Sequence, residues 1–122
     1  MGLDLATEKS EPWKLQQRDL VLFEAILQQM SEEVKAWGGN FAVVYLPAWD
    51  RYHTPHTYNV FRDNVLNILK KNNIPLVDLH SVFEKQDDVF ALFHFGLDGH
   101  YNKMGAQLVA EEVRKGLQSF SQ

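Results

Sequence analysis

The stretch Phe41-Ala42-Val43-Val44-Tyr45-Leu46-Pro47 decides the fold class of this chain. Six apolar residues follow one another and a proline ends the run, which is typical of a strand buried on both faces of a parallel sheet. Gly38-Gly39 separates this strand from the segment before it. We therefore expect a parallel sheet, with helices in the segments on either side of the strand.

The segment before the strand has the spacing of a helix. Its apolar residues follow one another at steps of three and four, which places them on one helical face. We expect this face to pack on the sheet, with Gly38-Gly39 ending the helix. The apolar residues are Leu20, Phe23, Leu27, Met30, Val34 and Trp37.

The segments after the strand repeat this alternation. Thr54-Pro55 predicts the start of a second helix, which Asn72-Asn73 ends. Residues 76–79 predict a second short strand, and the capping-box pattern of residues 81–84 predicts a brief helix capped by Ser81. The last helix is expected over residues 103–120. Its apolar face comprises Ala106, Val109, Val113, Leu117 and Phe120.

The predicted order of elements indicates an α/β fold with helices packed on a parallel sheet. Two strands alone make a poor sheet, because a stable sheet needs a third strand or good cover. We therefore expect a third strand in the N-terminal arm or near residues 91–95, or a second chain that completes the sheet. Residues 1–17 are predicted to be a flexible arm, and residues 18–122 a single α/β domain.

Composition excludes several functional classes. The chain has 122 residues, a net charge of −4 and no cysteine, so it can form neither a disulfide nor a cysteine-based metal site. No Lys/Arg-rich block indicates nucleic-acid binding. No apolar run is long enough for a membrane span, and no signal peptide is recognised. We expect a cytoplasmic protein without a cofactor.

The segment Asp98-Gly99-His100-Tyr101-Asn102 carries the most specific chemical pattern. Histidine is a common general base, and a carboxylate on its second ring nitrogen fixes the tautomer and stabilises the imidazolium. Asn102 is placed to cap the last helix. The alternative is that Asp98 caps a turn and His100 is an ordinary surface residue.

The run from Asp98 to Val113, DGHYNKMGAQLVAEEV, resembles the last block of the SGNH/GDSL hydrolases. These are serine esterases, lipases and acyltransferases with a flavodoxin-like α/β/α fold. The resemblance extends over residues 18–120 and covers the C-terminal half of that fold. It implies a truncated three-layer α/β/α domain with a short parallel sheet. It also implies that His100 is the catalytic base, that Asp98 orients it, and that the substrate is a small ester.

The nucleophile of that family has no counterpart in this chain. The Gly-Asp-Ser block and the Gly and Asn oxyanion donors are absent, and no serine lies on a sharp turn from strand to helix. Because loss of the triad serine lowers turnover roughly a millionfold, we expect the chain alone to be inactive. The serines are Ser10, Ser31, Ser81, Ser119 and Ser121.

Two other functions are compatible with the sequence. The first is a non-catalytic interaction domain, in which a homodimer completes the sheet through an exposed edge. The second is a metal-binding module, because imidazole and carboxylate suit Zn²⁺ or Fe²⁺. The aromatic residues Trp49, Tyr52 and Tyr58 are expected to line a substrate pocket or a subunit contact. The candidate metal ligands are His53, His56, His80, His94, Asp98 and His100.

Overall fold

The computed structural model describes residues 17–97 and 99–120, without the side chains of residues 55–61. It contains helices and a two-stranded parallel sheet, which confirms the predicted α/β class. The elements in chain order are α1 (Gln17–Ala36), β1 (Val43–Tyr45), α2 (Asp50–His53), α3 (Pro55–Lys71), β2 (Leu76–Asp78), α4 (Leu79–Phe83), the 3-10 helices η1 (Val89–Leu92) and η2 (His94–Gly96), and α5 (Lys103–Phe120).

The sheet is shorter than the sequence predicts. β1 pairs with β2 in parallel register, with Val44 opposite Val77. In the described part of the chain no third strand joins them. Residues 91–95, one of the places considered for a third strand, belong largely to η1 and η2, and Phe93 forms only an isolated antiparallel bridge with Tyr101.

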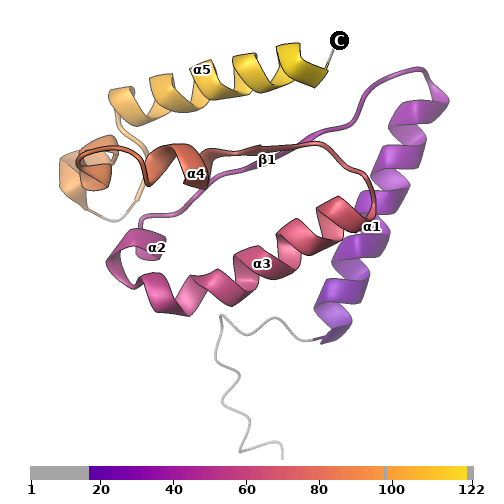
Figure 1. Cartoon of the computed structure of the whole chain (residues 1–122), viewed down its shortest axis with the longest axis horizontal. Helices are drawn as coiled ribbons and strands as arrows, with labels where there is room; N and C mark the ends of the chain where they lie inside the picture. The colour runs from indigo at the N-terminus through magenta and orange to yellow at the C-terminus, as the bar shows by residue number, and fades with distance from the viewer. Residues whose placement is uncertain (1–16, 98, 121–122) are drawn as a thin grey trace, which may run out of the picture.

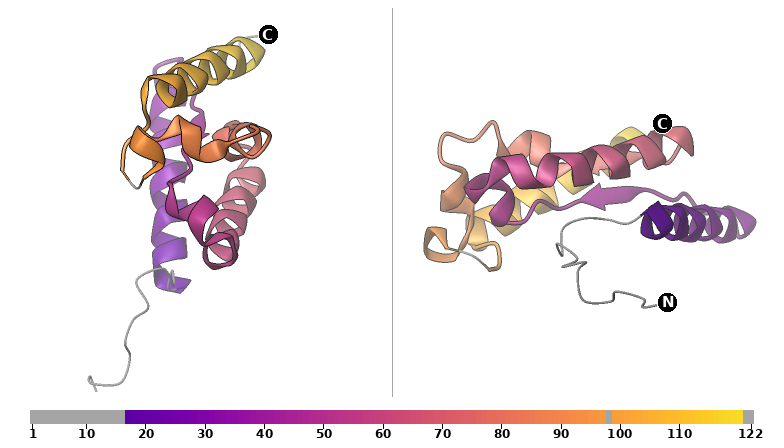
Figure 2. Two further views of the ribbon diagram at one scale, coloured as in Figure 1. Left: turned by 90° about the vertical axis from the view of Figure 1, so that its left-hand side faces the viewer. Right: turned by 90° about the horizontal axis from the view of Figure 1, so that it is seen from below.

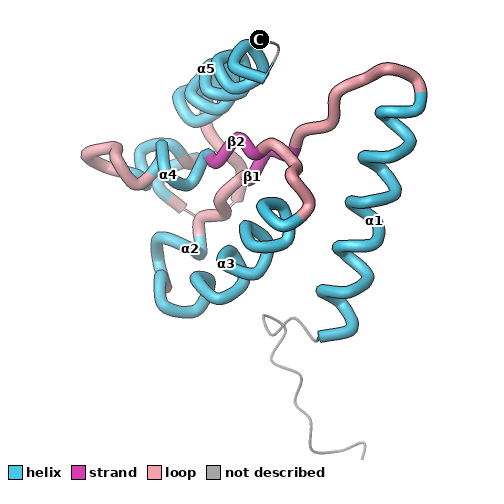
Figure 3. The backbone as a smooth tube through the Cα atoms, turned by 45° about the vertical axis from the view of Figure 1, so that its right-hand side comes forward, coloured by secondary structure: helices cyan, strands magenta, loops and turns pink. Residues whose placement is uncertain are grey.

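Helices lie on both sides of the two strands, with α5 on one side and α3 on the other (Figures 1, 2 and 3). Each side has its own apolar core. On the α5 side, buried side chains of β2, α4, η1 and the adjoining loop form one cluster: Val77, Leu79, Phe83, Leu92 and Phe93. On the α3 side, the second cluster comprises Leu27, Leu69 and Ile74.

The expectation that the first strand is buried on both faces is wrong. Val44 is 36% exposed and Leu46 is 54% exposed. The reason is the position of α5, which packs over β2 with Gly116 against the side chain of Val77. This leaves one face of β1 without a covering helix in the described residues.

The apolar face predicted for α1 is partly wrong. Leu27 is buried as expected, but Met30 is 47% exposed and Trp37 is 74% exposed. The buried face is instead completed by Ser31, which is 7% exposed. Polar contacts also hold α1 to the end of α3, where the Asn72 side chain bonds both Gln28 and Glu24.

Two predicted helix starts have different outcomes. α3 begins at Pro55, as predicted, and the short helix α2 directly precedes it. The predicted capping box at Ser81 is wrong, because α4 begins before Ser81. Its N-cap is Asp78, whose side chain accepts a hydrogen bond from the amide of His80. Ser81 lies inside α4 and its hydroxyl donates to the carbonyl of Asp78.

The predicted arm of residues 1–17 lies outside the described residues apart from Gln17, which begins α1. Among the described helices, none combines the length and apolar character that crossing a membrane requires.

Candidate functional site

The site lies where both strands end, which is the usual position for ligands in open parallel sheets. β1 ends at Tyr45 and leads into α2, and β2 ends at Asp78 and leads into α4. The segment before α5 reaches the same edge, because the Tyr101 hydroxyl donates to the carbonyl of Pro47. Trp49 makes a second link by donating from Nε1 to the carbonyl of Gly96 at 3.0 Å.

The loop that carries His100 is fixed at its exit. Asn102 caps α5 by accepting from the amide of Gly105 at 3.0 Å, as the sequence predicts. Its side-chain amide also donates to the carbonyls of Ala91 and Phe93. Burial raises the pKa of the neighbouring Tyr101 hydroxyl to about 12, so it stays protonated as a donor. The residue after His100 and the cap are therefore both anchored.

His100 itself is exposed at this edge. Its backbone carbonyl accepts from the amide of His94 at 3.3 Å, which ties the two sides of the loop together. Asp98, the predicted orienting carboxylate, lies outside the described residues. Nearby in sequence, Phe95 is 95% exposed and has a positive φ of 55°, an uncommon conformation for a bulky residue.

No serine of the described chain forms a nucleophile–base pair with His100. Ser31 is buried in α1, and the hydroxyl of Ser81 is engaged by a backbone carbonyl in α4. Ser119 lies in the last turn of α5. The predicted base thus stands on an anchored loop without a nucleophile among residues 17–97 and 99–120.

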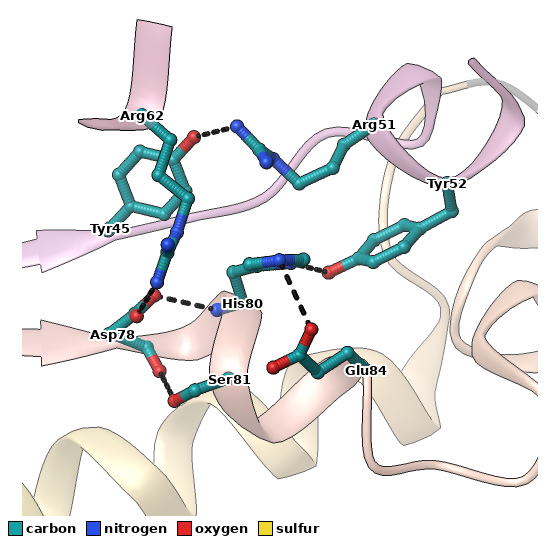
Figure 4. A network of polar contacts seen from close by, with 8 residues as sticks. All are labelled: Tyr45, Arg51, Tyr52, Arg62, Asp78, His80, Ser81 and Glu84. Atoms are coloured by element: carbon teal, nitrogen blue, oxygen red, sulfur yellow. Dashed lines mark hydrogen bonds and ion pairs between the residues drawn. The ribbon is translucent and has the colours of Figure 1, made fainter. Parts of the chain in front are cut away.

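A second group of polar side chains lies at the same edge (Figure 4). Arg62 of α3 forms an ion pair with Asp78, and both side chains are largely buried. Arg51 is 4% exposed and donates to the hydroxyl of Tyr45 at 2.7 Å. The two arginines also lie over the ring of Tyr45, so α2 and α3 are joined to the ends of both strands.

His80 lies within this group, between Tyr52 and Glu84 (Figure 4). Its Nδ1 is 3.1 Å from the hydroxyl of Tyr52, and its Nε2 is 3.5 Å from a carboxylate oxygen of Glu84. A carboxylate only accepts, so the proton belongs on Nε2 and Tyr52 donates to Nδ1. Burial, with help from the two nearby arginines, lowers the pKa of His80 despite the opposing carboxylates.

These residues border a cavity of about 530 Å³, within the size range of small-molecule sites. Tyr52 and His80 contribute to its wall, together with Arg51, Glu84 and the segment 86–90. Burial also raises the pKa of Tyr52, so that its hydroxyl remains a donor at neutral pH. The cavity therefore presents a neutral imidazole that is held in one tautomer.

We expect His80 to make the protein less stable in mild acid. Its ordinary pKa is 6.5, and burial lowers this value in the folded state. Between the two values the unfolded chain binds more protons, so stability falls as the pH decreases through the ordinary value of 6.5. Urea unfolding at pH values on either side of 6.5 should show a smaller loss of stability for His80→Gln than for the wild type. Equal losses for the two proteins would contradict this role of His80.

The predicted metal site is not formed in the described part of the chain. No three histidine or acidic side chains there lie close enough together to hold a metal ion. The ring of His53 stacks on Trp49 at 4.5 Å, whereas His80 faces Tyr52. His94 is exposed in η2. The side chain of His56, like that of Tyr58, is outside the described part.

Sequence reasoning missed most of the second group. Tyr52, which was predicted to line a substrate pocket or a subunit contact, borders the cavity. Arg51, Arg62, Asp78 and Glu84 were not singled out. One signal was available, because Asp78-Leu79-His80 repeats the Asp-x-His spacing at the end of a predicted strand. The distant partner Arg62 could not be found this way, because only the packing of α3 brings it to Asp78.

Comparisons of this chain with protein-family models, with curated proteins and with solved structures find no match.

Proposed function

We propose that this chain carries the histidine part of an ester-hydrolysing site of the SGNH/GDSL type. His100 is the general base and Asp98 is the carboxylate that orients it. The two strands and their helices then form part of a flavodoxin-like three-layer α/β/α fold. The nucleophilic serine and the oxyanion donors belong to a second polypeptide segment, so the chain alone has little activity.

The observation that carries this proposal is the presentation of His100. Its loop is anchored by Tyr101 and Asn102 at the carboxyl edge of the strands, while the imidazole remains exposed. A general base needs this combination of a fixed backbone and an open side chain, because it must reach the group that it deprotonates. The exposed side chains of Phe95 and Leu97 offer apolar surface for an acyl group.

The test is hydrolysis of p-nitrophenyl acetate by the purified chain. Any slow turnover should depend on His100 as a base, so His100→Ala should remove most of the rate above background. His94→Ala is the matched control, because His94 is also exposed and its backbone bonds the same loop. Equal rates for the two variants, both above the background rate, would contradict the assignment.

A fluorophosphonate probe tests the position of the nucleophile. The probe labels serines that are activated by a neighbouring base. The chain alone should stay unlabelled, because none of its described serines is bonded to a histidine ring. Labelling of any serine within this chain would show that no second segment is needed.

A further inference from the structure

His80 holds a hydrogen-bond donor that its neighbours in the described chain do not satisfy. Its Nδ1 accepts from the hydroxyl of Tyr52 at 3.1 Å, so the ring carries its own proton on Nε2 (Figure 4). The carboxylate oxygen of Glu84 lies 3.5 Å from Nε2, which is an ion-pair distance and too long for a good hydrogen bond. The side chain of His80 is only 14% exposed. A ligand that brings an acceptor to this N–H group would therefore be stabilised.

The cavity that His80 lines has apolar walls. Its volume is about 530 Å³, and its apolar lining comes from Tyr52, Val89 and Phe90, which are all partly buried. The ring of Tyr52 packs on the fully buried Phe83, with 6.3 Å between the ring centroids, so this wall is preformed. Small-molecule sites combine such walls with a few polar groups that fix the orientation of the ligand.

The charges around the cavity favour a cation. Its lining has one positive charge, on Arg51, and three negative charges, on Glu84, Asp87 and Asp88. Arg51 is 4% exposed, whereas the three acidic residues are exposed, so an entering molecule meets mainly negative charge. The carboxylate of Asp88 is also fixed in position, because it caps η1 by accepting from the amide of Phe90 at 3.1 Å.

We propose that this cavity binds a small organic cation, namely an amine with an aromatic body and a carbonyl oxygen. The carbonyl oxygen accepts from Nε2 of His80, and the aromatic body lies against Tyr52 and Phe90. The ammonium group faces Glu84 and its acidic neighbours, and the faces of the aromatic rings attract it further. The proposal does not depend on His100, because the described lining of the cavity includes no residue of the His100 loop.

Titration of the full chain with para-(aminomethyl)benzamide, followed by nuclear magnetic resonance, tests the proposal. This probe joins an ammonium group, a ring and a carbonyl oxygen, and a ligand of its size is expected to bind in the millimolar range. The imidazole signals of His80, assigned by their absence in His80→Phe, should shift to saturation. The uncharged para-methylbenzamide should bind about tenfold more weakly, and the anionic para-carboxybenzamide should not bind. Equal affinities for the amine and the uncharged analogue would overturn the proposal, as would His80 signals that the amine does not move.

Glu84→Gln tests the position of the ammonium group. The side chain of Glu84 is 56% exposed, so the fold should persist, and the dissociation constant of the amine should rise about three- to fivefold. Binding of the uncharged analogue should not change. Glu33→Gln is the matched control, because Glu33 is exposed on α1 and does not line the cavity. Equal effects of the two substitutions on the amine would overturn the proposal.

His80→Phe tests the hydrogen bond separately from the charge. Phenylalanine keeps a flat ring but removes the N–H donor, so the amine should bind about fivefold more weakly. The uncharged analogue should lose affinity by the same factor, because it carries the same carbonyl group. The backbone amide signals of residues 86–90, which line the cavity, report binding in this variant. Wild-type affinity of His80→Phe for both compounds would overturn the assigned contact.

Discussion

Replacing Gly105 with alanine is expected to destabilise the protein by about 3 kcal/mol, because the new methyl group has no room. A Cβ at this position would lie 2.3 Å from the backbone carbonyl oxygen of Leu92 and 3.0 Å from the Cβ of Tyr101. The carbonyl is part of η1 and cannot rotate away. The first turn of α5 must therefore move, and the contacts of Asn102 and Tyr101 must move with it.

Gly116→Ala is the matched control for this substitution. Both glycines lie in α5, and replacing either with alanine gains about 1 kcal/mol of helix propensity. At Gly116 the nearest atom is a methyl carbon of Val77 at 2.5 Å, which belongs to a side chain and not to the backbone. We expect a smaller loss of stability at Gly116 than at Gly105. Urea unfolding followed by circular dichroism measures both, and equal losses would show that the contact with Leu92 is not decisive.

The Gly105 substitution also connects stability with the proposed chemistry. The same turn that accommodates Gly105 contains the cap that fixes the exit of the His100 loop. A displaced turn should therefore lower His100-dependent hydrolysis even at temperatures where the variant is folded. We expect no such effect at Gly116, because this residue of α5 packs against β2 and is far along the helix from the His100 loop.

The sequence predicted the elements of this fold better than their surroundings. The start of α3 and the extent of α5 follow from local signals, namely Pro55 and the residues around the Asn102 cap. The exposure of Val44 and Met30 could not be predicted in this way. An apolar run shows that cover is needed, but it does not show whether another part of the same chain supplies it.

In the candidate site, too, local features were predicted and tertiary contacts were not. His100 and Asn102 were identified because the chemistry of their segment is local, and the structure confirms the cap. The group around His80 was missed because it depends on tertiary contacts between α2, α3 and the strand ends. The Tyr52–His80 contact joins residues that are 28 positions apart, and no local pattern indicates which tyrosine faces which histidine.

The aromatic cluster below the site explains why two separate groups are held at one edge. Phe83 is fully buried at the end of α4 and packs against three other rings. Its ring centroid lies 5.4 Å from Tyr101, 6.2 Å from Phe93 and 6.3 Å from Tyr52. Tyr101 adjoins His100 in the chain, and Tyr52 holds the ring of His80. Phe83 therefore supports both histidines without touching either proposed chemical group.

Phe83→Ala is accordingly expected to cost about 4 kcal/mol, which is the range for removing a buried aromatic ring from a core. Phe95→Ala removes the same atoms from a side chain that is 95% exposed, and should change stability by less than about 0.5 kcal/mol. Phe83→Leu should lose less than Phe83→Ala, because it keeps more of the buried apolar volume. Urea unfolding at neutral pH provides the three values. If Phe83→Ala and Phe95→Ala lost the same stability, the cluster would not be the support of this edge.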